Sequence, residues 1–378
     1  MMELFGKNYT VQELRKRVGA MAQVAGVRTV QFDDGNERPT RAALIHTGSG
    51  LDVTVLLDRC LDIASATYQG KAMGWQSKTG EVAPQYFEAE GLRWLRSYFG
   101  GLVTTCGLTH VGAPRPESAL LGNGLHGRIG HTPAKNVCVR QEWQGQDYVL
   151  SVTGTMREAV VFGENLTLTR TVSTKLGAKW FRIHDVVTNE GFDPTKYMLL
   201  YHCNIGWPAV DEGSEIVSPS RYVAPRDAEA EDGKENWYKM DGPIHKYAEK
   251  CYYHDMAPGR DGSVTISMLN AGFKRRAGEG FGVYLTYDKN QLPRFVEWKQ
   301  MGEQDYTLGF EPCNCGVEGR DIDEKLGLLH TLKAGESKTF DLEFGAVTTK
   351  AEAEALRAAA AKVKTEMVGS YKDFVKKS

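Results

Sequence analysis

The feature that most constrains this chain is a series of short segments in which apolar and polar residues alternate. They recur from about Val27 to Val347, as in LDVTVLLD, DYVLSVTGTM, NLTLTRTVST and KTFDLEFGAV. A period of two is typical of strands that bury one face. These segments follow one another with few helical patterns between them, which favours antiparallel pairing over strand–helix–strand units. We therefore predict an all-β sandwich or barrel.

Helices are expected only near the two ends of the chain. Thr10 and Glu13 have the spacing of a capping box, which predicts a short helix reaching about Gly19. The alanine- and glutamate-rich stretch from Ala351 predicts a C-terminal helix over residues 351–370. Because no linker interrupts the strand pattern, we expect one domain over residues 1–378, with its β core at about 20–345.

Charge and cysteine content indicate which partners and which cellular compartment to expect. Lys and Arg number 46 against 48 Asp and Glu, and the basic residues are dispersed, which argues against nucleic acid and membrane surfaces. No apolar run approaches the roughly 18 residues of a membrane span. The 7 scattered cysteines do not resemble a disulfide framework, so we expect a reducing cytoplasm. Without a phosphate-binding glycine loop we expect no cofactor, a small-molecule partner and, as an open possibility, a homodimer.

Three segments carry the residues best suited to acid/base chemistry. They are GNGLHGRIG with His126, YMLLYHCNIGWP with His202, and YTLGFEPCN with Glu311. If the second segment alternates as a strand, Leu200, His202 and Asn204 share one face. From reference pKa values, the glutamate is ionised and the histidine is partly protonated at pH 7, so one can accept a proton while the other donates one. Each residue also has an alternative role that is only structural. His202 could be a core histidine bonded to a backbone carbonyl, and Glu311 could be a strand-end carboxylate paired with an arginine.

The glycine-rich segment raises two further expectations. Its glycines suggest close approach of the backbone to a ligand, and His131 is expected to brace the loop. Cys106, His110, His126 and His131 are possible soft metal ligands. Their spacing matches no known zinc pattern, so no metal site is predicted.

On these residues the chain resembles the galactose-mutarotase-like (aldose 1-epimerase) superfamily, in particular a poorly characterised bacterial branch of it. The matching marks are Asn123-Gly124-Leu125-His126-Gly127, His202 and Glu311-Pro312, and the resemblance covers about residues 20–345. It implies a β-supersandwich and interconversion of sugar anomers without a cofactor.

The resemblance also implies roles for individual residues. Glu311 would take the proton from the anomeric hydroxyl, His202 would protonate the ring oxygen, and His126 would hold or polarise that oxygen. The opened sugar would rotate about its C1–C2 bond and close on the other face. Further contacts to the sugar are expected from a second set of residues: Arg59, Asn123, Arg128, Asn204 and Trp298.

Two other interpretations remain open from the sequence. Arg128 stands where the family has a glycine, which suggests an acidic or modified sugar. The chain could therefore be an isomerase, epimerase or lyase acting on such a sugar, with a metal at His126, His131 and Cys106 or His110. It could also be a sugar-binding protein without catalysis, because a fold alone does not determine function.

Overall fold

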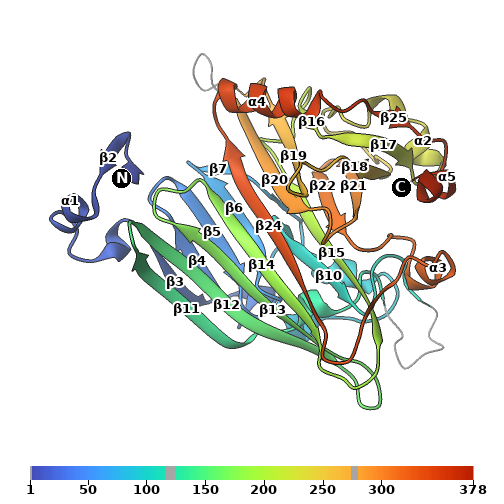
Figure 1. Ribbon diagram of the computed structural model, residues 1–378, viewed down its shortest axis with the longest axis horizontal. Helices are drawn as coiled ribbons and strands as arrows, with labels where there is room; N and C mark the ends of the chain where they lie inside the picture. The colour runs from blue at the N-terminus through green and yellow to red at the C-terminus, as the bar shows by residue number, and fades with distance from the viewer. Residues whose placement is uncertain (1, 116–123, 274–279, 378) are drawn as a thin grey trace.

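The computed structural model describes residues 2–115, 124–273 and 280–377, and strands make up most of its regular structure (Figure 1). Two eight-stranded sheets lie at its centre, and a five-stranded sheet from the N-terminal part joins them. The architecture is the predicted all-β supersandwich. Asn123, one of the expected sugar contacts, lies outside the described residues.

The first eight-stranded sheet carries most of the candidate acid/base residues. Its strands pair antiparallel, except for β17 and β25, which are parallel. Along the sheet they are β10 (Thr104–Leu108), β15 (Thr195–Ile205), β22 (Tyr306–Cys313), β21 (Arg294–Met301), β18 (Lys250–Met256), β17 (Ser220–Pro225) and β25 (Glu366–Met367), with β23 (His330–Leu332) beside β15.

The second eight-stranded sheet is antiparallel throughout and contains long hairpins. Residues of β12 are alternately buried and partly exposed along most of the strand, as the period-two pattern predicts. In order the strands are β11 (Lys135–Gln144), β12 (Asp147–Ala159), β13 (Asn165–Lys175), β14 (Trp180–Asn189), β24 (Ser337–Val347), β20 (Phe281–Asp288), β19 (Ser263–Asn270) and β16 (Glu215–Val217).

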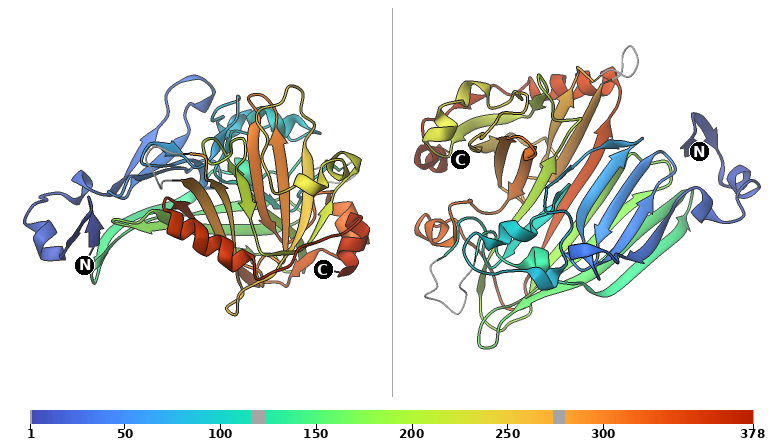
Figure 2. Two further views of the ribbon diagram at one scale, coloured as in Figure 1. Left: turned by 90° about the horizontal axis from the view of Figure 1, so that it is seen from above. Right: turned by 180° about the vertical axis from the view of Figure 1, so that it is seen from behind.

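The N-terminal part forms the five-stranded sheet and two short hairpin-like pairs. In Figure 2 the β1–β2 hairpin projects beyond the edge of the five-stranded sheet, at the periphery of the molecule. The five strands are β3 (Gly26–Gln31), β4 (Arg41–His46), β5 (Leu51–Leu56), β6 (Asp62–Tyr68) and β7 (Lys71–Ala72). The short pairs are β1 (Met2–Leu4) with β2 (Lys7–Tyr9), and β8 (Trp75–Gln76) with β9 (Gly100–Gly101).

The predicted N-terminal helix is present as α1 (Val11–Arg15), and both hydrogen bonds of its capping box form. It ends at Arg15, earlier than expected. The short helices α2 (Ala228–Glu231) and α3 (Arg320–Lys325) lie in loops. Within the described ranges, no helix is both long and apolar enough to cross a membrane.

The prediction of one continuous helix over 351–370 is wrong. Helix α4 (Lys350–Ala360) ends ten residues earlier, and β25 and α5 (Tyr371–Lys377) follow it. After α4, the Thr365 hydroxyl donates to the Ser220 carbonyl at 2.8 Å, and the Val368 amide donates to the Val223 carbonyl at 2.8 Å. Pairing with β17 and burial of Val368 therefore override the local helix propensity.

Candidate active site

His202 and Glu311 face each other across two neighbouring strands. The register pairs Leu200 with Cys313 and Cys203 with Phe310, which sets His202 of β15 opposite Glu311 of β22. Their side chains lie on one face of the sheet, with His202 Nε2 3.2 Å from Glu311 Oε1. Both residues are nearly buried, at 5% and 3% exposure. The fold thus brings together the imidazole and the carboxyl group that the sequence singled out.

Alternation along β15 separates this face from the main core. Tyr201 and Cys203 pack into the large hydrophobic core between the sheets. Met198 and Leu200 pack into a smaller cluster on the other side. His202 follows the same alternation as Leu200, so the acid/base pair lies on the face turned away from the main core.

A glycine leaves the space that the pair occupies. Gly309 of β22 pairs with Trp298 of β21. A Cβ atom at Gly309 would lie 2.8 Å from Glu311 Oε1, closer than real Cβ contacts, and 3.0 Å from Trp298 Cβ, which is also very tight. Absence of a side chain at Gly309 therefore lets Glu311 and Trp298 share this part of the sheet.

Burial changes the protonation that the sequence suggested. It raises the pKa of Glu311 well above its usual value, with further contributions from Cys313 and Glu249. It lowers the pKa of His202 to about 4, against the opposing effect of a hydrogen bond to Asn204. Both shifts favour the neutral forms. Burial therefore favours a carboxylic acid beside a neutral imidazole, sharing one proton, over the ionised glutamate that reference pKa values suggested.

Aromatic rings surround the pair. The ring centroid of His202 lies 5.2 Å from that of Trp298 and 5.3 Å from that of Tyr98. Trp75 lies 6.2 Å from Trp298, and Trp94 stacks on Tyr98 at 4.5 Å. Rings of this kind suit the apolar faces of a sugar, while their polar edges suit its hydroxyl groups.

Sequence reasoning selected Trp298 but missed Tyr98, Trp75 and Trp94. Trp75 belongs to the two-residue strand β8, and a 3₁₀ helix at Arg93–Ser97 positions the other two rings. The only cue in the sequence was aromatic density in GWQS and RWLRSYF.

His126 joins the cluster from the glycine-rich loop. Its ring centroid lies 5.6 Å from that of His202 and 5.0 Å from that of Trp94. Burial lowers the pKa of His126 well below its usual value, and the neighbouring His202 adds to this effect. His126 is therefore neutral at pH 7 and adopts a positive φ of 58°, an uncommon but known conformation for histidine.

The glycines beside His126 serve a different purpose from the expected one. A Cβ at Gly124 would lie 2.4 Å from the Ala89 carbonyl oxygen, and one at Gly127 would lie 2.5 Å from the His110 carbonyl oxygen. These glycines bring the loop against neighbouring backbone rather than against a ligand. They set the position of His126 by close packing.

Comparison of the sequence with models of known protein families identifies the family of this chain. The family model described as "Domain of unknown function (DUF4432)" matches residues 37–346, which is most of the chain. This chain belongs to the DUF4432 family. No curated protein matches the DUF4432 chain.

Solved structures similar to the DUF4432 chain share its fold. A candidate aldose 1-epimerase from Klebsiella pneumoniae has a TM-score of 0.84 and 25% identity, covering 91% of this chain and 90% of that one. A galactose mutarotase-like protein from Clostridium acetobutylicum has a TM-score of 0.53 and 10% identity, covering 86% and 100%. Galactose 1-epimerase from Lactobacillus acidophilus has a TM-score of 0.51 and 13% identity, covering 86% and 99%. The resemblance to this superfamily is confirmed.

Arg59 of the DUF4432 chain is placed as a brace rather than a sugar contact. Its guanidinium is fully buried and donates to the carbonyls of Gly130 at 2.7 Å and Ser97 at 3.1 Å. It also lies 2.9 Å from His131 Nε2. Phe87 stacks on His131 at 4.2 Å, so this histidine holds the loop, as expected. Arg59 ties the histidine loop to the segment that carries Tyr98.

Asn204 and Arg128, two further expected sugar contacts, are also placed differently. The Asn204 side chain is buried, its amide nitrogen donates to the carbonyls of Gly100 and Gly101, and its oxygen lies 2.7 Å from His202 Nδ1, so it contacts His202 rather than a ligand. Arg128 is exposed. Burial raises the pKa of Glu158, and the charge of Arg128 partly offsets that rise. For the alternative interpretation with a metal, the described residues contain no group of three or more His, Cys, Asp or Glu side chains suited to a metal.

A second buried histidine–glutamate pair lies on the opposite face of the same sheet. His254 Nε2 is 3.0 Å from Glu297 Oε2, and His254 Nδ1 is 2.9 Å from Ser220 Oγ. Trp237 covers the pair with its ring 5.0 Å from that of His254. Side chains of this pair are at most 1% exposed, so it is enclosed in the core and serves as an internal comparison for His202 and Glu311.

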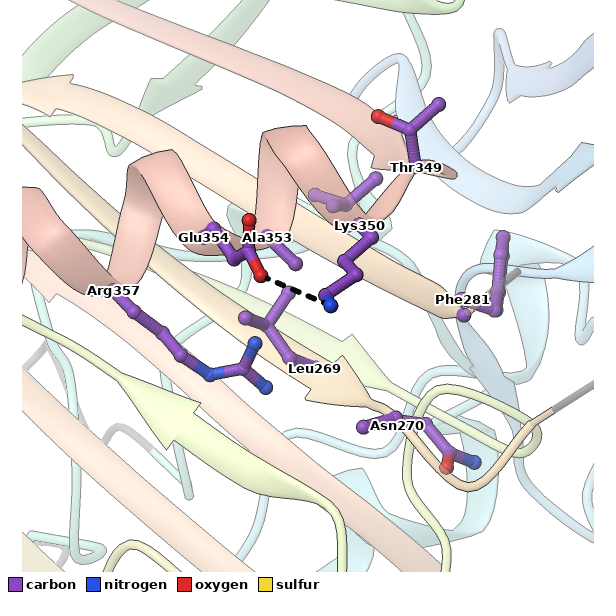
Figure 3. A pocket seen from close by; sticks show the side chains of 11 residues that line it. Leu269, Asn270, Phe281, Thr349, Lys350, Ala353, Glu354 and Arg357 are labelled. Atoms are coloured by element: carbon purple, nitrogen blue, oxygen red, sulfur yellow. Dashed lines mark ion pairs between the residues drawn. The ribbon is translucent and has the colours of Figure 1, made fainter. Parts of the chain in front are cut away.

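The pocket shown in Figure 3 is separate from the acid/base pair. It measures about 390 Å³, and α4 and strands β19 and β20 supply most of its lining. Its cations already have partners, since Lys350 lies 3.5 Å from Glu354 and Arg357 lies 2.7 Å from Glu215. None of the candidate acid/base residues lines this pocket.

Removal of the Arg59 guanidinium tests its role as a brace. We expect Arg59→Lys to lower the free energy of unfolding by about 2–4 kcal/mol, because buried carbonyl oxygens lose their donors. The control is Arg41→Lys, at a partly exposed ion pair with Asp58, where a smaller loss of about 1 kcal/mol is expected. Urea denaturation gives both values. Equal, small losses in the two variants would contradict the bracing role.

Proposed function

We propose that this protein interconverts the anomers of a sugar by acid/base ring opening, as an isomerase of the aldose 1-epimerase type. The observation that carries the proposal is the buried contact of 3.2 Å between His202 Nε2 and Glu311 Oε1 beside aromatic rings. The family resemblance and the structural likeness to a candidate aldose 1-epimerase support it.

Ring opening requires two proton movements at once. One proton leaves the anomeric hydroxyl, and another arrives at the ring oxygen as the bond from C1 to that oxygen breaks. A pair that shares one proton can do both, since the group without the proton accepts one while its partner donates. The carbonyl compound then rotates about its C1–C2 bond, and the reverse proton movements close the ring on the other face.

Residue roles follow from where the shared proton starts. With the proton on His202 Nε2, Glu311 is the base at the anomeric hydroxyl and His202 is the acid at the ring oxygen, as the resemblance implies. This form is one proton transfer, over 3.2 Å, from the neutral pair. The neutral His126 supplies a hydrogen-bonding group beside them without adding charge.

The charges around the pair favour a neutral sugar. The nearby cation Arg226, whose charge opposes the burial-driven rise in the pKa of Glu311, is already bonded to Asp227 and Glu249. Arg128 is exposed and acts on Glu158, so it offers no support for an acidic sugar. All seven cysteines are unpaired, which suits the proposed cytoplasmic location.

Polarimetry of freshly dissolved single anomers tests the proposal. The panel contains neutral aldoses, uronates and one methyl glycoside, each with and without the wild-type protein. We expect faster equilibration for at least one neutral aldose and no change for the methyl glycoside, which lacks an anomeric hydroxyl. No acceleration for any sugar would overturn the proposal, and calorimetric binding without acceleration would identify a carbohydrate-binding protein.

A further inference from the structure

The orientation of the Asn204 side chain is fixed by its surroundings. Its Nδ2 atom lies 3.2 Å from the Gly100 carbonyl oxygen, 3.3 Å from that of Gly101 and 3.2 Å from that of His202. Only the amide nitrogen can donate to carbonyl oxygens. Asn204 Oδ1 must therefore point the other way, toward the ring of His202.

This orientation determines which nitrogen of His202 carries hydrogen. Asn204 Oδ1 lies 2.7 Å from His202 Nδ1 and 2.8 Å from the Tyr98 hydroxyl oxygen. An amide oxygen only accepts, so His202 Nδ1 must donate to it at 2.7 Å, and the Tyr98 hydroxyl donates to it as well. The Tyr98 hydroxyl oxygen also lies 3.1 Å from His202 Nδ1, where it can accept a share of the same hydrogen. Burial raises the pKa of Tyr98, which keeps its hydroxyl group protonated as a donor. His202 Nδ1 therefore carries a hydrogen, and Nε2, the atom facing Glu311, is free to accept or release the shared proton.

His126 has the opposite arrangement. The backbone amide of Gly112 donates to His126 Nδ1 at 3.4 Å. A nitrogen that accepts from an amide has no hydrogen of its own, so the neutral ring carries its hydrogen on Nε2.

We propose that the fold holds the two site histidines as opposite tautomers, His202 with hydrogen on Nδ1 and His126 with hydrogen on Nε2, and that Asn204 and Tyr98 are positioning residues for His202. Only Nε2 of His202 then exchanges a proton with Glu311, while Nε2 of His126 is a fixed donor. The kinetic consequence rests on the proposed function, but the tautomers themselves are measurable without any substrate.

Long-range ¹H–¹⁵N correlation spectra of protein labelled with ¹⁵N-histidine test this directly. His202→Asn and His126→Asn variants assign the two sets of signals. At pH 7 we expect the Nδ1–H tautomer for His202 and the Nε2–H tautomer for His126. Finding His202 as the Nε2–H tautomer or as imidazolium, or His126 as the Nδ1–H tautomer, would overturn the proposal.

Tyr98→Phe tests the positioning role, because it removes one hydroxyl and leaves the ring. We expect a mixture of His202 tautomers, unchanged His126 signals, and a kcat lower by roughly 10- to 100-fold with little change in KM. A catalytic histidine in the wrong tautomer can cost about 10⁴-fold, and here Asn204 remains as a partial guide.

The matched control is Tyr252→Phe, which removes a buried hydroxyl bonded to the Ala230 carbonyl at 3.1 Å. It should leave the His202 signals and kcat unchanged. Unchanged tautomer signals and kcat in Tyr98→Phe would refute the positioning role. Wild-type protein that shows the expected tautomers but exchanges no sugar anomers would refute the proposed function and leave the tautomer assignment intact.

Discussion

Replacement of Glu311 by glutamine is expected to abolish sugar-anomer exchange without weakening the fold. General acid/base groups contribute about 10²- to 10⁴-fold to rate, and glutamine can neither accept nor release the shared proton. Its amide can still donate to His202 Nε2 across the present 3.2 Å contact, so the local structure is retained. Kinetics and urea denaturation of Glu311→Gln measure the two effects separately.

The stability of Glu311→Gln should also depend on pH in a defined direction. The pKa of Glu311 is raised in the folded protein. As pH rises above the unfolded value of about 4.3, the unfolded state loses its proton first, so the wild type loses stability until the folded pKa is passed. Glutamine does not titrate and so removes this loss. The free energy of unfolding of Glu311→Gln should therefore rise relative to that of the wild type as pH rises over that range.

A matched control is available on the other face of the sheet. Burial also raises the pKa of Glu297, which pairs with His254. Glu297→Gln should show the same kind of stability gain with rising pH and keep full exchange activity. Loss of activity in both glutamine variants would point to a general structural effect and contradict the role given to Glu311.

His202→Asn is expected to slow exchange by a similar factor of about 10²–10⁴. The double variant with Glu311→Gln should be no slower than the slower single variant, because the two groups pass one proton between them and act as a unit. In the wild type, kcat/KM should fall below about pH 4, where His202 gains a second proton and the pair has no base. It should fall again at high pH, once Glu311 ionises and the pair has no acid.

Kinetics of the two single variants, the double variant and the wild type across pH provide this test. Multiplicative losses in the double variant would contradict a shared proton. So would a wild-type pH profile without an alkaline limb, since that limb requires the pair to lose its last proton.

The fold was predictable because alternation along a strand directly reflects the burial of one face. Leu200 and His202 lie on one face of β15, and Tyr201 and Cys203 lie on the other, as the period of two predicts. The residue at which the C-terminal helix ends was not predictable from the sequence. Val368 is buried against β17, and that contact depends on how distant parts of the chain pack.

The residue types of the candidate site were predictable from the sequence, whereas the protonation of these residues and the placement of Arg59 were not. His202, Glu311 and His126 meet, as the family resemblance implied. Their protonation could not be predicted from reference pKa values, because burial shifts both pKa values toward the neutral forms. Arg59 was expected to contact the sugar, whereas carbonyl oxygens from separate loops surround it in the core.

The most direct test of the account is two-dimensional exchange NMR of a sugar at anomeric equilibrium, with equal amounts of wild type or Glu311→Gln at pH 7. We expect exchange cross-peaks between the α and β C1–H signals with the wild type. With the variant, exchange should fall to the uncatalysed rate. Cross-peaks of equal intensity with both proteins, or none with the wild type for every sugar of the panel, would contradict it.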